Sequence, residues 1–219
     1  MSCILALDTS NARGSVAVVC DGAVVFNEHF TSERSHNSQL FTPLSKALML
    51  SGSDLRAIVV GTGPGSYTGA RIGIAAAQGI ALSRNVPVIG LHSVLAPETK
   101  ELSREFVGCG DARRGKFFIA RVRDGMLDGE ITLHDSDEFT QRHAQDAAVP
   151  WFSFDAKPPL DLANITLTTP SASRLALLAS SMTDETIWTL EQQPLEPHYL
   201  AAPFVTQAKV NTALTDQRE

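Results

Sequence analysis

The sequence is poor in cysteine and contains none of the short motifs that hold zinc. Its three cysteines, Cys3, Cys20 and Cys109, lie far apart and form no C-x-x-C pair, which argues against a disulfide framework and a cysteine zinc site. The six histidines form neither H-x-x-x-H nor H-E-x-x-H, so no ligand set for a zinc hydrolase is visible. A G-x-S-x-G elbow is also missing, which argues against a serine hydrolase. This cysteine usage indicates a reducing cytoplasm.

Long apolar runs and an excess of basic residues are missing as well. No stretch approaches the roughly 20 apolar residues that span a bilayer, and residues 1–8 have no basic region before their short apolar run. We therefore expect neither a secretory signal nor a membrane contact. With a formal net charge of -6, the chain lacks the basic face that free-standing nucleic-acid binding needs. The densest basic stretch, 113–123, is interpreted as a turn and a solvated strand face.

The pattern that the sequence does contain is that of an α/β protein. Short apolar runs bounded by turn residues predict buried strands, and Asp21-Gly22 predicts a two-residue hairpin. The strands expected in the first hundred residues are 3–7, 15–20, 23–30, 57–60 and 86–91. Helices are expected over 38–51, with Pro43 in the first turn or at a kink, and over 70–83. This order predicts a mixed five-stranded sheet with helices packed on it.

The second half of the chain is less regular. Its expected elements are strands over 117–123 and 126–134, joined by a turn at Asp124-Gly125, and a helix over 171–182. The segment 111–115 is interpreted as either a polar site loop or a salt-bridged turn. Three prolines interrupt 135–169, which is left unassigned, and the polar end, 210–219, is expected to fray.

Two segments have residues suited to contact phosphate. Asp8-Thr9-Ser10 ends the first strand, where an Asp can position a metal-bound water and hydroxyls can face phosphate oxygens; such a turn also forms simply to satisfy backbone donors. The stretch 61–69 has four glycines and a proline, and Ser66 or Thr68 can cap the helix after it. A helix N-terminus reached through glycines is a ready anion site, but a tight turn without a ligand explains it too. The pattern is neither a Walker A loop nor a Rossmann fingerprint.

The helix after this stretch is rich in glycine and alanine. Gly69, Gly73 and Ala77 are four residues apart and therefore share one face. An interior glycine costs about 1 kcal/mol relative to alanine, so close packing must offset that cost. The packing partner is either the chain's own sheet or another subunit.

Several of these segments resemble the bacterial TsaB family, an accessory component of tRNA threonylcarbamoyladenosine synthesis. The similar segments are 4–10 (ILALDTS), 61–73 (GTGPGSYTGARIG), 78–81 (QGIA), 111–115 (DARRG) and 196–200 (EPHYL). The resemblance is strong through residue 92 and weak from about 125 to 190. It implies a two-lobed actin-like ATPase fold with a degenerate second lobe. The implied N-terminal lobe is 1–103, completed by 195–212, and the second lobe is 104–194.

The resemblance further implies a partner subunit and not a catalyst. In the family, a TsaD-type subunit holds the metal and transfers the threonylcarbamoyl group to adenosine 37 of tRNAs that read ANN codons, and a TsaE-type ATPase joins the pair. Where TsaD-type relatives carry an H-x-x-x-H metal pair, this chain has Ser93 and Pro97. We therefore expect no catalytic residue, no metal and no cofactor. A homodimer is expected when the partner is absent, and tRNA is expected to be reached only through the complex.

ATP binding is not expected, because Thr62 stands where the family often has Arg and 151–157 lacks the glycines of a second nucleotide loop. The residues of a vestigial phosphate site are Asp8, Thr9, Ser10, Gly63, Gly65 and Ser66. Those expected at a partner or dimer interface are His36, Leu40, Leu44, Gly69, Ile72, Gly73, Ala76 and Ala77. Two other functions stay open: an ATP-dependent, sugar-kinase-like phosphotransferase and, on weaker grounds, a metallopeptidase.

Overall fold

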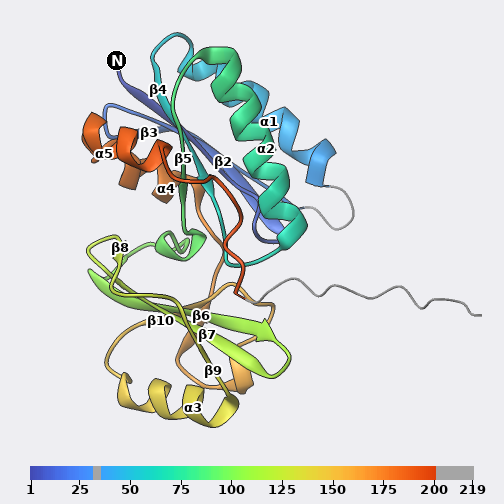
Figure 1. Ribbon diagram of the computed structural model, residues 1–219, viewed down its shortest axis with the longest axis vertical. Helices are drawn as coiled ribbons and strands as arrows, with labels where there is room; N and C mark the ends of the chain where they lie inside the picture. Colours follow the sequence, from blue (N-terminus) through green and yellow to red (C-terminus); the bar gives the residue numbers. More distant parts are fainter. Residues whose placement is uncertain (32–35, 201–219) are drawn as a thin grey trace, which may run out of the picture.

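Two sheets, one in each of two lobes, organise the chain. The computed structural model describes residues 1–31 and 36–200, without the side chains of residues 36–38. Figure 1 shows the first lobe above the second, with the chain crossing between them more than once. The polar end that is expected to fray, 210–219, lies outside the described residues, as does 201–212 of the segment expected to complete the first lobe.

The sheet of the first lobe is mixed, as predicted. Its strands are β1 (Cys3–Asp8), β2 (Arg13–Cys20), β3 (Ala23–Thr31), β4 (Leu55–Gly61) and β5 (Val88–Leu91). They lie in the order β3-β2-β1-β4-β5, with β1 to β3 antiparallel and β4 and β5 parallel to β1. Asp21 and Gly22 have positive φ values of 49° and 79°, which confirms the predicted hairpin.

Helices cover both faces of this sheet. Its helices are α1 (His36–Ser51), α2 (Tyr67–Arg84), α4 (Ala172–Ser180) and α5 (Asp184–Glu191). Because strand side chains alternate, Leu5 and Leu7 pack with α1 and α2, whereas Ile4 and Ala6 pack with α4. α2 begins three residues before the predicted start. Pro43 lies inside α1, beyond its first turn, because the helix already starts at His36.

The predicted lobe boundary at residue 194 does not match the packing of the last two helices. Both α4 and α5 fall within 104–194, yet α4 packs on β1 and β2 and α5 packs on β5, all in the first lobe (Figure 1). The apolar cluster under α4 continues into the second sheet through Phe106 and Phe152. The chain therefore returns to the first sheet at α4, earlier than the sequence suggested.

The second lobe repeats the strand arrangement of the first. Its elements are β6 (Glu105–Arg113), β7 (Lys116–Arg123), β8 (Met126–Leu127), β9 (Thr132–His134), α3 (Ser136–Gln145), β10 (Trp151–Ser153) and β11 (Ile165–Leu167), with short 3-10 turns η1 (Ser93–Leu95) and η2 (Pro159–Asp161). The order is β11-β10-β6-β7-β8, and β9 also pairs with β7. As in the first sheet, antiparallel pairing on one side of a central strand meets parallel pairing on the other. β6 thus takes the place that β1 has in the first lobe.

Several predictions for the second lobe were incomplete. The expected strand 126–134 is divided into β8 and β9, and Gly129 between them has a φ of 93° that a regular strand does not allow. The segment 111–115, interpreted as a polar site loop or a salt-bridged turn, is the end of β6 and its hairpin turn, in which Arg113 lies 3.6 Å from the Asp111 carboxylate. The unassigned segment 135–169 contains α3 and two strands of three residues each, which are too short to leave a periodic signal.

The sequence argued against a disulfide framework, but the structure contains one disulfide. Cys3 and Cys20 form a disulfide across a separation of 17 residues, because the antiparallel register of β1 and β2 places them directly opposite each other. Spacing along the chain does not reveal such a pair. Cys109 is free and buried. Among residues 1–31 and 36–200, we find no helix with the length and apolar character of a membrane span.

Candidate functional site

The turn between β4 and α2 lies against the turn between β1 and β2. Gly63 has a φ of 96°, a conformation that favours glycine. Ser66 caps α2, as predicted: its hydroxyl accepts a hydrogen bond from the Gly69 amide at 3.1 Å. The Ser66 amide donates to the Ser10 carbonyl at 2.6 Å. The start of α2 is therefore fixed to the first turn of the chain.

Asp8 is fully buried within this contact. Its Oδ1 accepts hydrogen bonds from the Ser10 amide at 2.8 Å and the Ser10 hydroxyl at 2.7 Å. The Ser10 and Ser93 hydroxyl oxygens are 3.0 Å apart, and Ser93 accepts from the Gly63 amide at 3.0 Å. Burial raises the pKa of Asp8, and the neighbouring polar groups of Ser93 and Ser10 offset part of that rise. Its Oδ2 has no hydrogen-bond partner and lies so close to Gly61 that a Cβ there would be 1.8 Å away.

The structure brings the six predicted phosphate-site residues together, but it closes the space between them. Asp8, Thr9 and Ser10 are each at most 1% exposed. The Thr9 hydroxyl donates to the Gly69 carbonyl at 2.7 Å, and a Cβ on Gly65 would be 2.2 Å from the Ser10 carbonyl oxygen. Their hydroxyls are therefore used within the protein, and a phosphate role stays a prediction. Among the described residues, no group of three or more His, Cys, Asp or Glu could hold a metal ion.

The glycine stripe of α2 faces inward, so its assignment to a partner interface was wrong. Gly69, Gly73 and Ala77 are all buried. A Cβ on Gly69 would lie 1.9 Å from the Thr9 carbonyl oxygen, and one on Gly73 would lie 2.3 Å from Thr9 Oγ1. Of the two packing partners that the sequence left open, the chain's own β1–β2 turn is the one observed.

The outer face of α1 and α2 carries an apolar groove of about 740 Å³. Its lining residues are Phe41, Leu44, Ser45, Leu48, Ile72, Ala75, Ala76, Gly79, Ile80 and Ser83. Phe41 is 58% exposed, and a Cβ on Gly79 would meet no atom within 4 Å. Figure 1 shows the two helices running side by side over the sheet. Large apolar side chains left exposed next to small ones are typical of a docking surface.

Three of the predicted interface residues, Leu44, Ile72 and Ala76, line this groove. Leu40 is buried beneath it, and the His36 side chain lies outside the described residues. The sequence analysis missed Phe41, Leu48, Ala75, Gly79 and Ile80. Their spacings of three and four residues on two neighbouring helices are a signal that could have found them, had the helices been known to lie side by side.

A short segment after α5 crosses β5 and ends at the start of α2. The His198 amide donates to the Thr62 carbonyl at 2.8 Å, and the Tyr199 and Tyr67 rings stack with centroids 4.9 Å apart. A polar pocket of about 400 Å³ lies beneath the segment. There the His92 ring meets His198 edge to face, at 4.6 Å between centroids. Burial, with a smaller effect of His198, lowers the pKa of His92 to about 4, and burial also lowers the pKa of His198.

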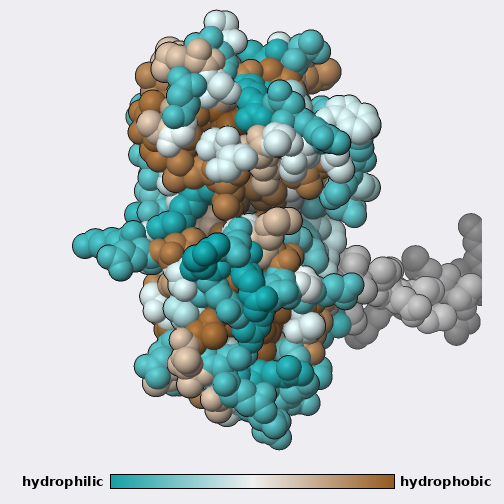
Figure 2. Space-filling view, turned by 90° about the vertical axis from the view of Figure 1, so that its left-hand side faces the viewer, coloured by the Kyte–Doolittle hydropathy of each residue, from teal (hydrophilic) through white to brown (hydrophobic). Residues whose placement is uncertain are grey.

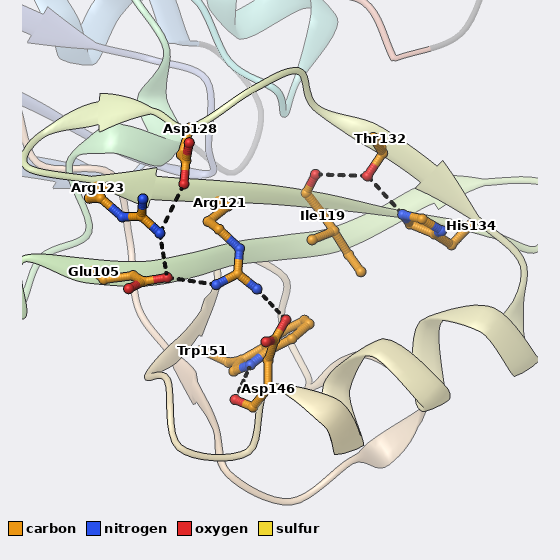
Figure 3. A network of polar contacts seen from close by, with 9 residues as sticks. All are labelled: Glu105, Ile119, Arg121, Arg123, Asp128, Thr132, His134, Asp146 and Trp151. Carbon is orange, nitrogen blue, oxygen red and sulfur yellow. Dashed lines mark hydrogen bonds and ion pairs between the residues drawn. The ribbon is translucent and has the colours of Figure 1, made fainter.

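The second lobe carries an ion-pair network on β6, β7 and the segment after α3 (Figure 3). Arg121 contacts Glu105 at 2.6 Å and also pairs with Asp146. Arg123 contacts Asp128 at 3.1 Å and Glu105 at 3.4 Å. The charges of both arginines are therefore balanced by carboxylates, which agrees with the interpretation that these side chains lie on a strand face. On the side shown in Figure 2, apolar residues gather over the first lobe, whereas the second is mainly hydrophilic.

Comparison with known proteins gives relatives for this architecture. A family model described as TsaD, tRNA N6-adenosine threonylcarbamoyltransferase, matches residues 30–138, about half of the chain. The chain is 36% identical over 140 residues to the Escherichia coli tRNA threonylcarbamoyladenosine biosynthesis protein TsaB, which covers 59% of this chain and 60% of that protein. The Bacillus subtilis protein of the same name is 32% identical over 133 residues, covering 57% and 58%. The chain thus matches about three fifths of the length of these curated relatives.

Solved structures extend the likeness to nearly the whole chain. A Pseudomonas aeruginosa protein described as similar to the peptidase YeaZ superposes with a TM-score of 0.67 at 24% identity, over 92% of this chain and all of that one. YeaZ from the same species gives a TM-score of 0.63 at 23% identity, over 91% and 100%. At such identities the likeness shows the fold. Repeated mixed sheets in two lobes, joined through a shared core, define an α/β protein of the actin-like ATPase architecture.

Within that class, the curated relatives are TsaB proteins. The chain is similar to the TsaB family in sequence, in agreement with the motifs that resemble that family.

We predict opposite effects on stability for two glycine-to-alanine changes in α2. Gly69→Ala should lower the free energy of unfolding by roughly 2–3 kcal/mol, because its Cβ would overlap the Thr9 carbonyl, which backbone packing holds in place. Gly79→Ala, which meets no atom, should raise it by up to about 1 kcal/mol through helix propensity. Urea denaturation of both variants measures the difference. Equal stabilities would contradict the inward packing of the stripe.

A second prediction concerns the buried carboxyl of Asp8. The folded-state pKa of Asp8 is raised above the ordinary value of 3.8, so the folded state binds this proton more tightly than the unfolded chain. The contribution of protonated Asp8 to the free energy of unfolding therefore falls as pH rises through 3.8 toward the folded pKa. Asp8→Asn keeps the shape of the side chain but cannot ionise, so it avoids the free-energy cost of a buried carboxylate. The stability of the variant relative to the wild type should therefore increase from pH 3 to pH 7, as followed by urea denaturation at each pH.

Asp135 provides the control of opposite sign. It caps α3, and the hydrogen bond from the Glu138 amide lowers its pKa. The carboxylate of Asp135 therefore stabilises the fold above pH 3.8, so Asp135→Asn should become less stable relative to the wild type as pH rises. A difference for Asp8→Asn that does not change with pH would contradict the burial of an ionisable Asp8.

Proposed function

We propose that this chain is a non-catalytic subunit that supports threonylcarbamoyl transfer to adenosine 37 of tRNA by docking on a TsaD-type catalytic subunit. The observation that carries the proposal is the apolar groove between α1 and α2. It exposes Phe41 on a helix face that the rest of the described chain leaves uncovered. The curated relatives bear names in tRNA threonylcarbamoyladenosine biosynthesis, which supports the choice of pathway.

The groove has the composition of a helix-docking surface. Aromatic and aliphatic side chains from α1, including Phe41 and Leu48, form one wall, while Ala75 and Gly79 of α2 form a low floor. Small residues let another helix approach closely, and large ones supply the buried apolar area that drives association. Because Gly69 and Gly73 fix α2 from the inside, this outer face is presented without rearrangement, which lowers the entropic cost of docking. The same face would serve a homodimer when the partner is absent.

The residues at the turn between the lobes support an accessory role. Ser93, one of two residues that stand in for the TsaD-type histidines, has its hydroxyl engaged with Ser10 and the Gly63 amide. Pro97, the other, pairs with Pro170 in an isolated bridge between the lobes. Neither residue type is a ligand that zinc or iron prefers. We therefore place the metal and the group transfer on the partner, with a TsaE-type ATPase completing the assembly in the cytoplasm.

We predict that a charge placed on the floor of the groove blocks docking. Ala75→Glu should weaken binding to the TsaD-type subunit at least about 100-fold, because a carboxylate would be buried in an apolar contact without a partner. Ala75 is exposed in the free chain and Glu is a good helix former, so the variant should fold normally. Calorimetric titration of the partner measures the affinity, and light scattering reports any homodimer.

Gln78→Glu is the matched control for this experiment. Gln78 is exposed on the same helix but does not line the groove, so the variant adds the same charge outside the proposed contact. It should bind like the wild type. Unchanged docking by Ala75→Glu, or an equal loss in both variants, would count against the groove as the docking surface.

The alternative, a sugar-kinase-like phosphotransferase, leads to a different outcome. Because Asp8, Thr9 and Ser10 are buried and hydrogen-bonded within the protein, the isolated chain should give no saturable heat on titration with Mg-ATP. Tight binding accompanied by ATP turnover would reverse the ranking of the two functions.

A further inference from the structure

Basic residues gather at the tip of the β6–β7 hairpin. Arg113 pairs with Lys116 across the strands, so Arg114 and Gly115 form a two-residue loop with φ values of 57° and 70°. Positive φ at both loop positions is the geometry of a type I′ hairpin. The Arg113 side chain is 87% exposed, and Lys116 is exposed as well. Three cations thus occupy four consecutive positions on a chain whose net charge is -6.

The base of the hairpin holds this tip in place. The Asp111 amide donates to Asp155 Oδ2 at 2.7 Å, and the Arg113 amide donates to Asp111 Oδ1 at 2.7 Å. Beneath them, Phe118 packs so closely on Gly110 that a Cβ there would be 2.6 Å from its ring. A rigid base reduces the entropy that the tip loses when it meets a ligand.

The tip differs from other basic sites of the chain in how its charge is compensated. Arg121 and Arg123 are held in the network of Figure 3, where Arg121 lies 2.6 Å from Glu105. At the tip, Arg113 lies 3.6 Å from the Asp111 carboxylate, and Lys116 has no ion pair in residues 1–31 and 36–200. The positive charge of Lys116 helps to lower the pKa of the nearby Asp135. Arg114 also interacts within the chain, so the variants that test the tip leave Arg114 unchanged.

An exposed Arg and Lys side by side suit phosphate oxygens, since guanidinium binds phosphate in a bidentate manner and ammonium as a point charge. In Figure 1 the tip points to the same side of the molecule as the N-terminal end of α2. We propose that Arg113 and Lys116 contact the phosphate backbone of tRNA within the assembled complex. This inference rests on the proposed function and replaces the expectation that tRNA is reached only through the partner. The acidic chain alone would bind RNA weakly; the tip adds contacts to RNA that the partner already holds.

Two matched double variants test the contact. In complex with the TsaD-type subunit, Arg113→Ala with Lys116→Ala should weaken binding of a fluorescent tRNA about tenfold at moderate salt. The slope of log affinity against log salt concentration should fall by between one and two, one for each lost phosphate contact. Lys100→Ala with Arg104→Ala removes the same charge at the opposite end of β6, where Arg104 is 89% exposed. That control should leave both quantities unchanged.

The possible outcomes separate this inference from the proposed function. Wild-type affinity and slope in the tip variant, or an equal loss in the control, would overturn the tRNA contact. So would weaker docking of the tip variant on the TsaD-type subunit without tRNA, because the tip would then be a protein contact. Failure of the wild-type chain to dock at all contradicts the proposed function itself, and it is measured before any tRNA is added.

Discussion

The first lobe depends on the contact between Thr9 and the first two turns of α2. Thr9 donates its hydroxyl to the Gly69 carbonyl, and its own carbonyl and hydroxyl occupy the space that side chains at Gly69 and Gly73 would take. No residue with a Cβ fits at Gly69 without moving the β1–β2 turn. α2 therefore packs on the sheet in a single orientation about its own axis. The Ser66 cap and the hydrogen bond to the Ser10 carbonyl fix the residue at which the helix begins.

That single rotation determines which face of α2 remains available. With Gly73 and Ala77 turned inward, Ala75, Gly79 and Ile80 turn outward next to α1. The same contact buries Asp8 and uses the hydroxyls that a phosphate would need. One contact therefore has two consequences: the polar groups of the first turn are enclosed, and the opposite face of α2 is left exposed beside α1.

The second lobe is a shortened copy of the first, and ion pairs occupy part of the surface of its sheet. It keeps antiparallel pairing on one side of the central strand and parallel pairing on the other, but β10 and β11 have only three residues each. Part of its outer surface is held by the ion pairs of Arg121 and Arg123, whose individual contribution at an exposed site is small. The core that it shares with α4 therefore supplies much of its attachment to the first lobe. The β6–β7 hairpin, the counterpart of the β1–β2 turn, carries cations where the first lobe carries buried hydroxyls.

The sequence by itself determined the features that depend on near neighbours. The strands β1 to β5, the Asp21-Gly22 hairpin and the Ser66 cap follow from alternation, turn chemistry and capping within a few residues, and family motifs lie in the same segments. Tertiary structure alone decided the Cys3–Cys20 pairing, the return of α4 to the first sheet and the inward rotation of the glycine stripe. Each of these depends on contacts between residues far apart in the chain, such as Thr9 with Gly69. The spacing of Gly69 and Gly73 predicts close packing, but only the folded chain shows that they pack against Thr9 in its first turn.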